Sequence, residues 1–123
     1  MQQFSTSHAY DLEERTTKFG ENVVTLCNHL KPTIVSTPLI DQLVSSATSV
    51  GANYREANNA SSKRDFRNKI YICKKEIVET KYWLRLLAKC YVECKEQLRV
   101  LYKEAQELTM IFQKIATSLS AKV

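Results

Sequence analysis

The sequence predicts an all-α protein, an antiparallel up-down four-helix bundle formed by a single domain of 123 residues. Four segments place apolar or small residues at alternating spacings of four and three, which keeps one stripe of each helix facing its partners. Only two Gly and two Pro occur, which argues against a turn-rich β architecture. The links between segments are short, so neighbouring helices should run antiparallel. The predicted helices span residues 11–30, 38–58, 62–88 and 93–119.

The helix predicted over 11–30 has both a start signal and a stop signal. Asp11, with Glu14 three positions later, forms a candidate capping box, and Pro32 disfavours helix at the residue before it. Residues 1–9 show no period and are expected to fray or pack loosely. The apolar stripe comprises Leu12, Thr16, Phe19, Val23, Leu26 and Leu30.

The helix predicted over 38–58 begins with Thr37 as N-cap and Pro38 at the first helical position. Gly51 lies on its stripe, one turn from Ala47, which favours close contact with another helix. The stripe comprises Ile40, Val44, Ala47, Gly51, Tyr54 and Asn58. A parallel row comprises Leu39, Leu43, Ser46, Val50, Asn53 and Ala57. A wide arc of this helix is therefore expected to be buried.

The helix predicted over 62–88 begins at a capping box of Ser62 and Asp65, and the rest of the chain is organised around it. Its stripe comprises Phe66, Ile70, Cys73, Ile77, Thr80, Leu84 and Leu87. The period is interrupted between residues 89 and 93 without Gly or Pro. The last helix then shows the most regular stripe: Cys94, Leu98, Leu101, Ala105, Leu108, Phe112, Ile115 and Leu119.

Positive charge is concentrated on the third predicted helix. Residues 62–89 contain nine basic and three acidic side chains, a net charge of +6, in a chain whose total is +5. A helical wheel places Lys63, Arg67, Lys74, Lys81 and Arg85 within about 40° of one another, and we call this set the ridge. The ridge contains no acidic residue. It predicts contact with a phosphate backbone, and the alternative is a solvated helix face on a protein-interaction scaffold.

The predicted nucleic-acid-binding residues are Lys63, Arg64, Arg67, Lys74, Lys81 and Arg85. A second apolar arc lies on the same helix, about 120° from the first stripe, and carries Ile72, Trp83, Leu86 and Cys90. One core face does not need two stripes, so the chain is expected to self-associate. The predicted oligomer interface comprises Leu39, Leu43, Val50, Ile72, Trp83 and Leu86.

Signals for catalysis, metal binding or a cofactor are absent from the sequence. His8 and His29 belong to no catalytic or metal motif and are interpreted as structural. Cys90 and Cys94, one turn apart, make an incomplete zinc set, and small apolar filler is the default role for buried cysteine. With Gly20 as the only glycine besides Gly51, no phosphate-binding loop can form. The chain is therefore predicted not to be an enzyme.

Two further side-chain sets have competing interpretations. Glu76 and Glu79 are predicted to pair with Lys75 and Lys81 on the same helix, not to act as an acid/base pair. Tyr82 and Trp83 stack on bases under one interpretation and pack against protein under the other. An interface role is favoured for Trp83.

The cellular setting is predicted from composition. Four cysteines, the lack of an apolar N-terminal region and the lack of an apolar run near 18 residues indicate a cytoplasmic protein with reduced thiols and no membrane partner.

Two runs, LVSSATSVGANYREA from Leu43 and SSKRDFRNKIYICKKEIVETKYWLRLL from Ser61, carry a family resemblance. They resemble the four helix bundle protein family, which comprises proteins encoded in intervening sequences of bacterial 23S ribosomal RNA genes. The related accessory variability determinant of diversity-generating retroelements belongs with it. The resemblance is strong over the two middle helices and extends to the outer two by pattern. The turn at residues 58–60 and the glycine-free junction at residues 89–93 depart from the commoner family pattern.

The resemblance implies a small all-α bundle that assembles into a ring, typically a homopentamer, without catalytic activity. In the retroelement branch it implies a positively charged ring that binds a reverse transcriptase and nucleic acid. The matching positions are interpreted as fold and assembly determinants. They are Asn53, Tyr54, Arg55, Glu56, Lys75, Glu76, Glu79, Thr80, Tyr82, Trp83 and Leu84.

Overall fold

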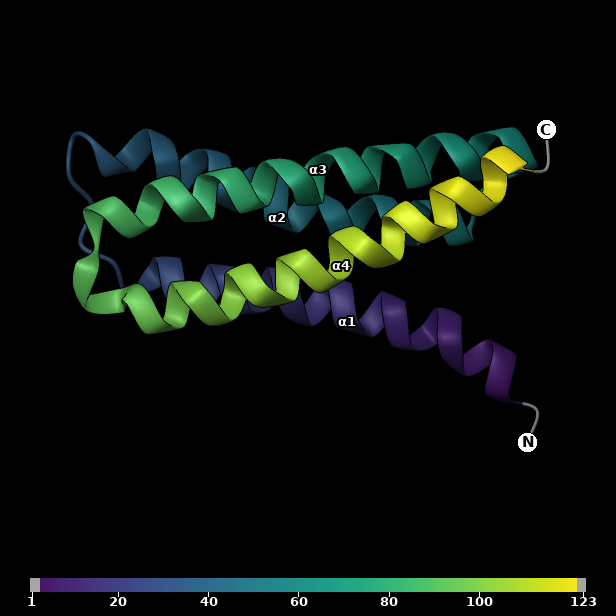
Figure 1. Ribbon diagram of the computed structural model, residues 1–123, viewed down its shortest axis with the longest axis horizontal. Coiled ribbons are helices and arrows are strands. Elements are labelled where there is room, and N and C mark those ends of the chain that lie inside the picture. The colour runs from purple at the N-terminus through teal and green to yellow at the C-terminus, as the bar shows by residue number, and fades with distance from the viewer. Residues whose placement is uncertain (1–2, 122–123) are drawn as a thin grey trace.

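The computed structural model describes the backbone of residues 3–121 and the side chains of residues 11–120. Within that range the chain is entirely helical, with no strand (Figure 1). Its elements are α1 (Gln3–Asn28), α2 (Ser36–Asn58), α3 (Lys63–Cys90), the short 3₁₀ helix η1 (Val92–Cys94) and α4 (Lys95–Ala121). Successive long helices run back and forth along one axis. The all-α class and the four-helix bundle are confirmed.

The third helix holds the bundle together, because α3 packs against both α2 and α4. The pair α1 and α2 is also closely packed, whereas α1 and α4 share the fewest contacts of these neighbouring pairs. Figure 1 shows the first half of α1 turning away from α4. Across the centre, the rings of Tyr54 and Phe112 meet edge to face with centroids 5.8 Å apart. No helix in the described range is long and apolar enough to span a bilayer.

The predicted stripes form the core. On α3 every predicted member except half-buried Phe66 is buried. In the stripe predicted over residues 11–30, every member except half-buried Leu26 is buried, and Leu30 lies just beyond the end of α1. On α2 the buried arc is wide, as predicted, and it takes residues from both the stripe and the parallel row. Leu43 and Val50 are fully buried inside the subunit. Their predicted place in an oligomer interface is wrong, because they present no surface to a second copy.

Of the four predicted helix starts, two are wrong and one is confirmed, while the last, at residue 93, falls within η1, two residues before α4 begins. The first helix begins at Gln3, so Asp11 lies within α1 and does not cap it. The second begins at Ser36, where Thr33 and Ser36 cap each other: each backbone N–H donates to the other hydroxyl, at 2.9 and 3.0 Å. Ser62 caps α3 as predicted, its hydroxyl accepting from the Asp65 N–H at 3.0 Å.

A hydroxyl at the α3–α4 junction ties two loops together. The phenol of Tyr91, a buried residue, donates to the carbonyl of Lys31 at 2.6 Å and lies 2.7 Å from the hydroxyl of Ser36. Ser36 is fully buried, so the link between α1 and α2 is fastened to the junction between α3 and α4. The interrupted period at residues 89–93 thus marks a structural joint.

The close approach of α1 to α2 explains why the stripe of α2 contains a glycine. A Cβ on Gly51 would lie 3.4 Å from the backbone carbonyl carbon of Thr16, so α1 and α2 meet here almost backbone to backbone. On the other side of α2, the Thr80 hydroxyl donates to that of Ser46 at 2.9 Å within the core. These contacts fix the register of α2 against both neighbours.

One polar cluster joins the first and last helices. The guanidinium of Arg15 on α1 donates to both carboxylate oxygens of Glu104 at 2.7 and 2.9 Å and to Glu107 at 2.7 Å. Hydrogen bonding to Glu104 is the main reason that the pKa of Arg15 is raised. Both glutamates lie on α4, so this cluster closes the seam where neighbouring long helices share the fewest contacts.

We expect Tyr91→Phe to lower the free energy of unfolding by about 1 to 3 kcal/mol, because it removes the donor to the Lys31 carbonyl and the acceptor of the Ser36 hydroxyl at a buried joint. Urea denaturation followed by circular dichroism measures the change. Tyr102→Phe is the matched control, since the half-buried Tyr102 makes no hydrogen bond to any described side chain or backbone group. Equal stability of the two variants would contradict the role given to the Tyr91 hydroxyl.

Candidate nucleic-acid interface

The structure places the ridge at the border between the core and the surface. Lys63 and Arg85, near its ends, are exposed, whereas Arg67, Lys74 and Lys81 are half-buried beside the apolar stripe. Long basic side chains can cover apolar surface with their stems while the charged ends reach water. The middle of the ridge is therefore less open than a helical wheel indicates.

The cations of α3 are almost entirely uncompensated. Lys69 pairs with Glu56 on α2 at 2.7 Å, and this hydrogen bond and charge raise the pKa of Lys69. No other basic side chain of α3 has a salt bridge to a described residue, which leaves eight of nine without an acidic partner. The predicted pairing of Glu76 and Glu79 with Lys75 and Lys81 does not occur. Partial burial, and then the charge of Glu79, raise the pKa of Glu76.

A second line of residues lies opposite the core stripe and is more open than the ridge. Its members fall within about 40° of one another on the helix, and all are exposed. We call this set the outer line: Arg64, Tyr71, Lys75, Tyr82 and Lys89. Of these, only Arg64 was predicted from sequence to belong to the interface, and Tyr82 had two competing interpretations. The other members could have been found from the sequence by taking the positions that lie opposite the core stripe on a helical wheel.

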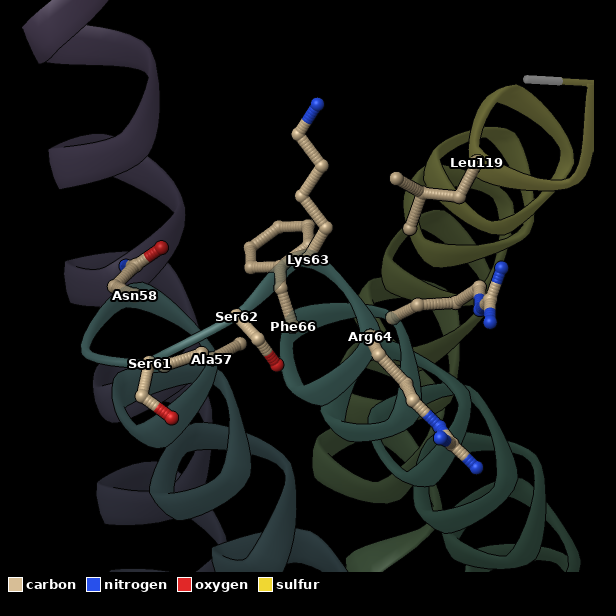
Figure 2. A pocket seen from close by; sticks show the side chains of 10 residues that line it. Ala57, Asn58, Ser61, Ser62, Lys63, Arg64, Phe66 and Leu119 are labelled. Carbon is tan, nitrogen blue, oxygen red and sulfur yellow. The ribbon is translucent and has the colours of Figure 1, made fainter. Parts of the chain in front are cut away.

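A hollow at one end of α3 does not gather these charges. This open hollow of about 790 Å³ is lined by the α2–α3 turn, the start of α3 and Leu119 of α4 (Figure 2). In Figure 2 the charged ends of Lys63 and Arg64 point away from each other. The cations diverge, so they form an extended surface along the helix and no compact anion cradle.

The second apolar arc of α3 is divided between core and surface. Trp83 and Cys90 pack against the core of their own subunit, and the indole Nε1 of Trp83 is buried without a described hydrogen-bond partner. Ile72 and Leu86 are half-buried and do not join the core cluster. Leu39 of α2 is half-buried against the core. Only part of the predicted interface is therefore available to a neighbour.

The cysteines and histidines do not converge on a site. Among the described residues, no three His, Cys, Asp or Glu side chains are placed to hold a metal ion. All four cysteines are free. His29 is exposed and shares a hydrogen bond with the carbonyl of Thr25 at 2.7 Å, while the side chain of His8 lies outside the described residues. Burial raises the pKa of the Cys73 thiol to about 12, which disfavours the reactive thiolate.

We expect Cys73 to resist a thiol reagent at about pH 8 in the folded protein, because it is buried and its raised pKa keeps it protonated. In concentrated guanidinium chloride it should react like an ordinary cysteine. Mass spectrometry of labelled peptides locates the modified residues, and Cys73→Ser confirms the assignment. Rapid labelling of Cys73 in the native state would be inconsistent with this burial.

Comparison with known proteins agrees with this architecture. The sequence profile described as 23S rRNA-intervening sequence protein matches residues 9–114, most of the chain. The chain belongs to this family. The resemblance on the two middle helices is thereby confirmed for the intervening-sequence proteins. No curated protein matches the chain.

A solved structure of similar fold supports the family assignment. It is the crystal structure of a protein of unknown function from the S23 ribosomal protein family of Bacteroides thetaiotaomicron VPI-5482. The two chains are 32% identical, the match covers 85% of the present chain and 96% of that chain, and the TM-score is 0.74. Because the function of that relative is unknown, a function for the present chain has to be argued from its own surface.

Proposed function

We propose that this protein is a non-enzymatic accessory protein that binds nucleic acid through the cations of α3. The observation that carries the proposal is the uncompensated charge of this helix, where eight of nine basic side chains have no acidic partner among the described residues. A charged helix that served only solubility or subunit-internal pairing would be expected to intersperse both signs on its exposed face. The one exposed acidic residue on α3 is Glu79.

Phosphate binding suits an extended and diverging set of cations. A nucleic-acid backbone presents one negative charge per nucleotide along its length, so a line of Lys and Arg can contact several phosphates in succession. Each contact releases condensed counterions, which supplies affinity without reading sequence. α3 is 28 residues long, or roughly 42 Å at 1.5 Å per residue, which is enough for several such contacts.

We expect an unstructured oligonucleotide to bind at low salt and to lose roughly 50-fold in affinity between about 50 and 200 mM salt, if about four phosphates are contacted. Arg64→Gln, Lys75→Gln, Lys89→Gln should weaken binding and flatten this salt dependence. Fluorescence anisotropy measures both. These three outer positions are preferable to the half-buried ridge cations, because their substitution leaves the packing of α3 intact.

A matched control removes the same charges elsewhere. Arg99→Gln, Lys103→Gln, Lys114→Gln changes one Arg and two Lys at exposed positions of α4. This variant should keep most of the affinity, since its cations are not on α3. If wild-type protein fails to bind at low salt, or both triple variants bind alike, the nucleic-acid proposal fails and a protein-interaction scaffold takes its place.

We also propose that the protein acts as a homo-oligomer, with the pentamer implied by the resemblance as the expected size. Support comes from Ile72 and Leu86, apolar side chains that are half-buried on α3 without joining the core. Apolar side chains that remain partly exposed outside the subunit's own core are typical of a site of association. A reverse transcriptase partner and a cytoplasmic location remain part of the proposal, the first on the resemblance alone and the second supported by four free thiols.

We expect Ile72→Glu, Leu86→Glu to dissociate the oligomer, because each change would bury a carboxylate at the subunit contact. Sedimentation velocity reports the mass, and circular dichroism checks that helicity is retained. Val100→Glu, Met110→Glu is the control, since these exposed apolar residues lie on α4 and should not alter the mass. A wild-type protein that sediments as a monomer at all concentrations would argue against self-association.

A further inference from the structure

Cations and tyrosines alternate along the outer line of α3. From the start of the helix to its end the order is Arg64, Tyr71, Lys75, Tyr82 and Lys89. The spacings of seven, four, seven and seven keep all five on one exposed face. Tyr71 is 41% and Tyr82 55% exposed, so both rings reach solvent although they are large and partly apolar. Neither ring is required by the core.

Each ring is nevertheless held in place by one contact. The phenol of Tyr71 lies 3.0 Å from the hydroxyl of Ser120 on α4, a hydrogen-bond distance that anchors the far end of the side chain. The ring of Tyr82 meets Trp83 edge to face, with centroids 5.0 Å apart and an interplanar angle of 70°. Trp83 is itself packed on the core. An aromatic side chain that is already oriented loses less conformational freedom when a flat ligand stacks on it.

We propose that the outer line is a binding track for single-stranded nucleic acid, in which Tyr71 and Tyr82 stack on bases while Arg64, Lys75 and Lys89 contact phosphates. This inference rests on the proposed function and specifies the form of its ligand. A duplex keeps the faces of its bases stacked inside, so only its phosphates can contact the outer line, through the three cations. A single strand offers both its phosphates and its base faces to such a track.

The dimensions fit a strand of modest length. The two tyrosines are eleven positions apart, or about 16 Å along the helix axis, which corresponds to roughly five nucleotides at a spacing of 3.4 Å. Nothing in the track distinguishes one base from another, because every base has a face on which a ring can stack. The expected ligand is therefore an unpaired stretch of RNA or DNA of any sequence.

Three fluorescein-labelled probes test the inference by anisotropy at low salt: oligo(dT), oligo(rU) and a blunt duplex, each about twenty nucleotides long. Both single strands should bind at least about tenfold more tightly than the duplex, since stacking adds to phosphate contact. Tyr71→Ala and Tyr82→Ala should each weaken single-strand binding by between about fivefold and 150-fold and leave duplex binding unchanged. The Tyr→Phe variants at both positions keep a ring and should retain most of the affinity.

A direct readout separates stacking from electrostatics. Irradiation of a single strand containing 5-iodouracil should form adducts on Tyr71 or Tyr82, which mass spectrometry of the digested protein identifies. Adducts located only on other residues would overturn the inference. The same holds if a Tyr→Phe variant loses as much affinity as the Ala variant at that position, since the ring would then not be the binding element.

The failure of this inference is distinguishable from the failure of the proposed function. Equal affinity for duplex and single strands overturns the stacking role and leaves phosphate binding standing. Binding of none of the three probes overturns both. Binding of oligo(rU) alone also overturns the inference, because phosphates and base faces are common to RNA and DNA. If the Tyr→Ala variants change the sedimenting mass and not single-strand affinity, the outer line is a protein interface instead.

Discussion

The apolar stripe of α3 is the constraint on which the rest of the structure depends. It is covered from one side by α2 and from the other by α4, so the rotation of α3 about its own axis is fixed. The rotation that buries Ile70, Ile77 and Leu84 forces the positions opposite them into solvent. Core packing therefore decides which side chains of this helix are offered to a partner, and it makes the placement of the outer line rigid.

Buried hydroxyls add a specificity that apolar contact lacks. Apolar side chains tolerate small sliding movements between helices. Breaking a hydrogen bond inside the core is costly, because it leaves a buried polar group without a partner. The Thr80–Ser46 bond aligns α3 with α2, and the hydroxyl of Tyr91 aligns the junction before α4 with the loop before α2. Together they fix how far each helix extends along its neighbour, and so where the cations of α3 stand relative to the ends of the bundle.

The sequence predicted the helices well because their apolar period survives in three dimensions. Apart from the close helix contact at Gly51, it did not predict features that depend on neighbours. The start of α2 depends on a reciprocal cap by Thr33 and Ser36. The sequence predicted a later start, because Thr37 followed by Pro38 is itself a favourable helix start. Leu43 was assigned to an interface because a wheel cannot show how wide an arc two neighbouring helices cover. For the candidate site, the concentration of charge on one helix was visible in the sequence. The half-burial of Lys74 required the packing of the neighbouring helices to be known, whereas the openness of Lys75 follows from its position opposite the core stripe.

The fork of Arg15 on Glu104 and Glu107 has a consequence for how the bundle opens. Three of the helix contacts depend mainly on apolar burial, which added salt does not screen, but the seam between α1 and α4 combines sparse packing with an ion cluster that is about one-third exposed at Arg15 and Glu104. Rising ionic strength, or acid sufficient to protonate the two carboxylates, would loosen this seam before any other. The first helix would stay attached through its close contact with α2, so the bundle would open as a groove between α1 and α4 while α3 stays packed between its two neighbours.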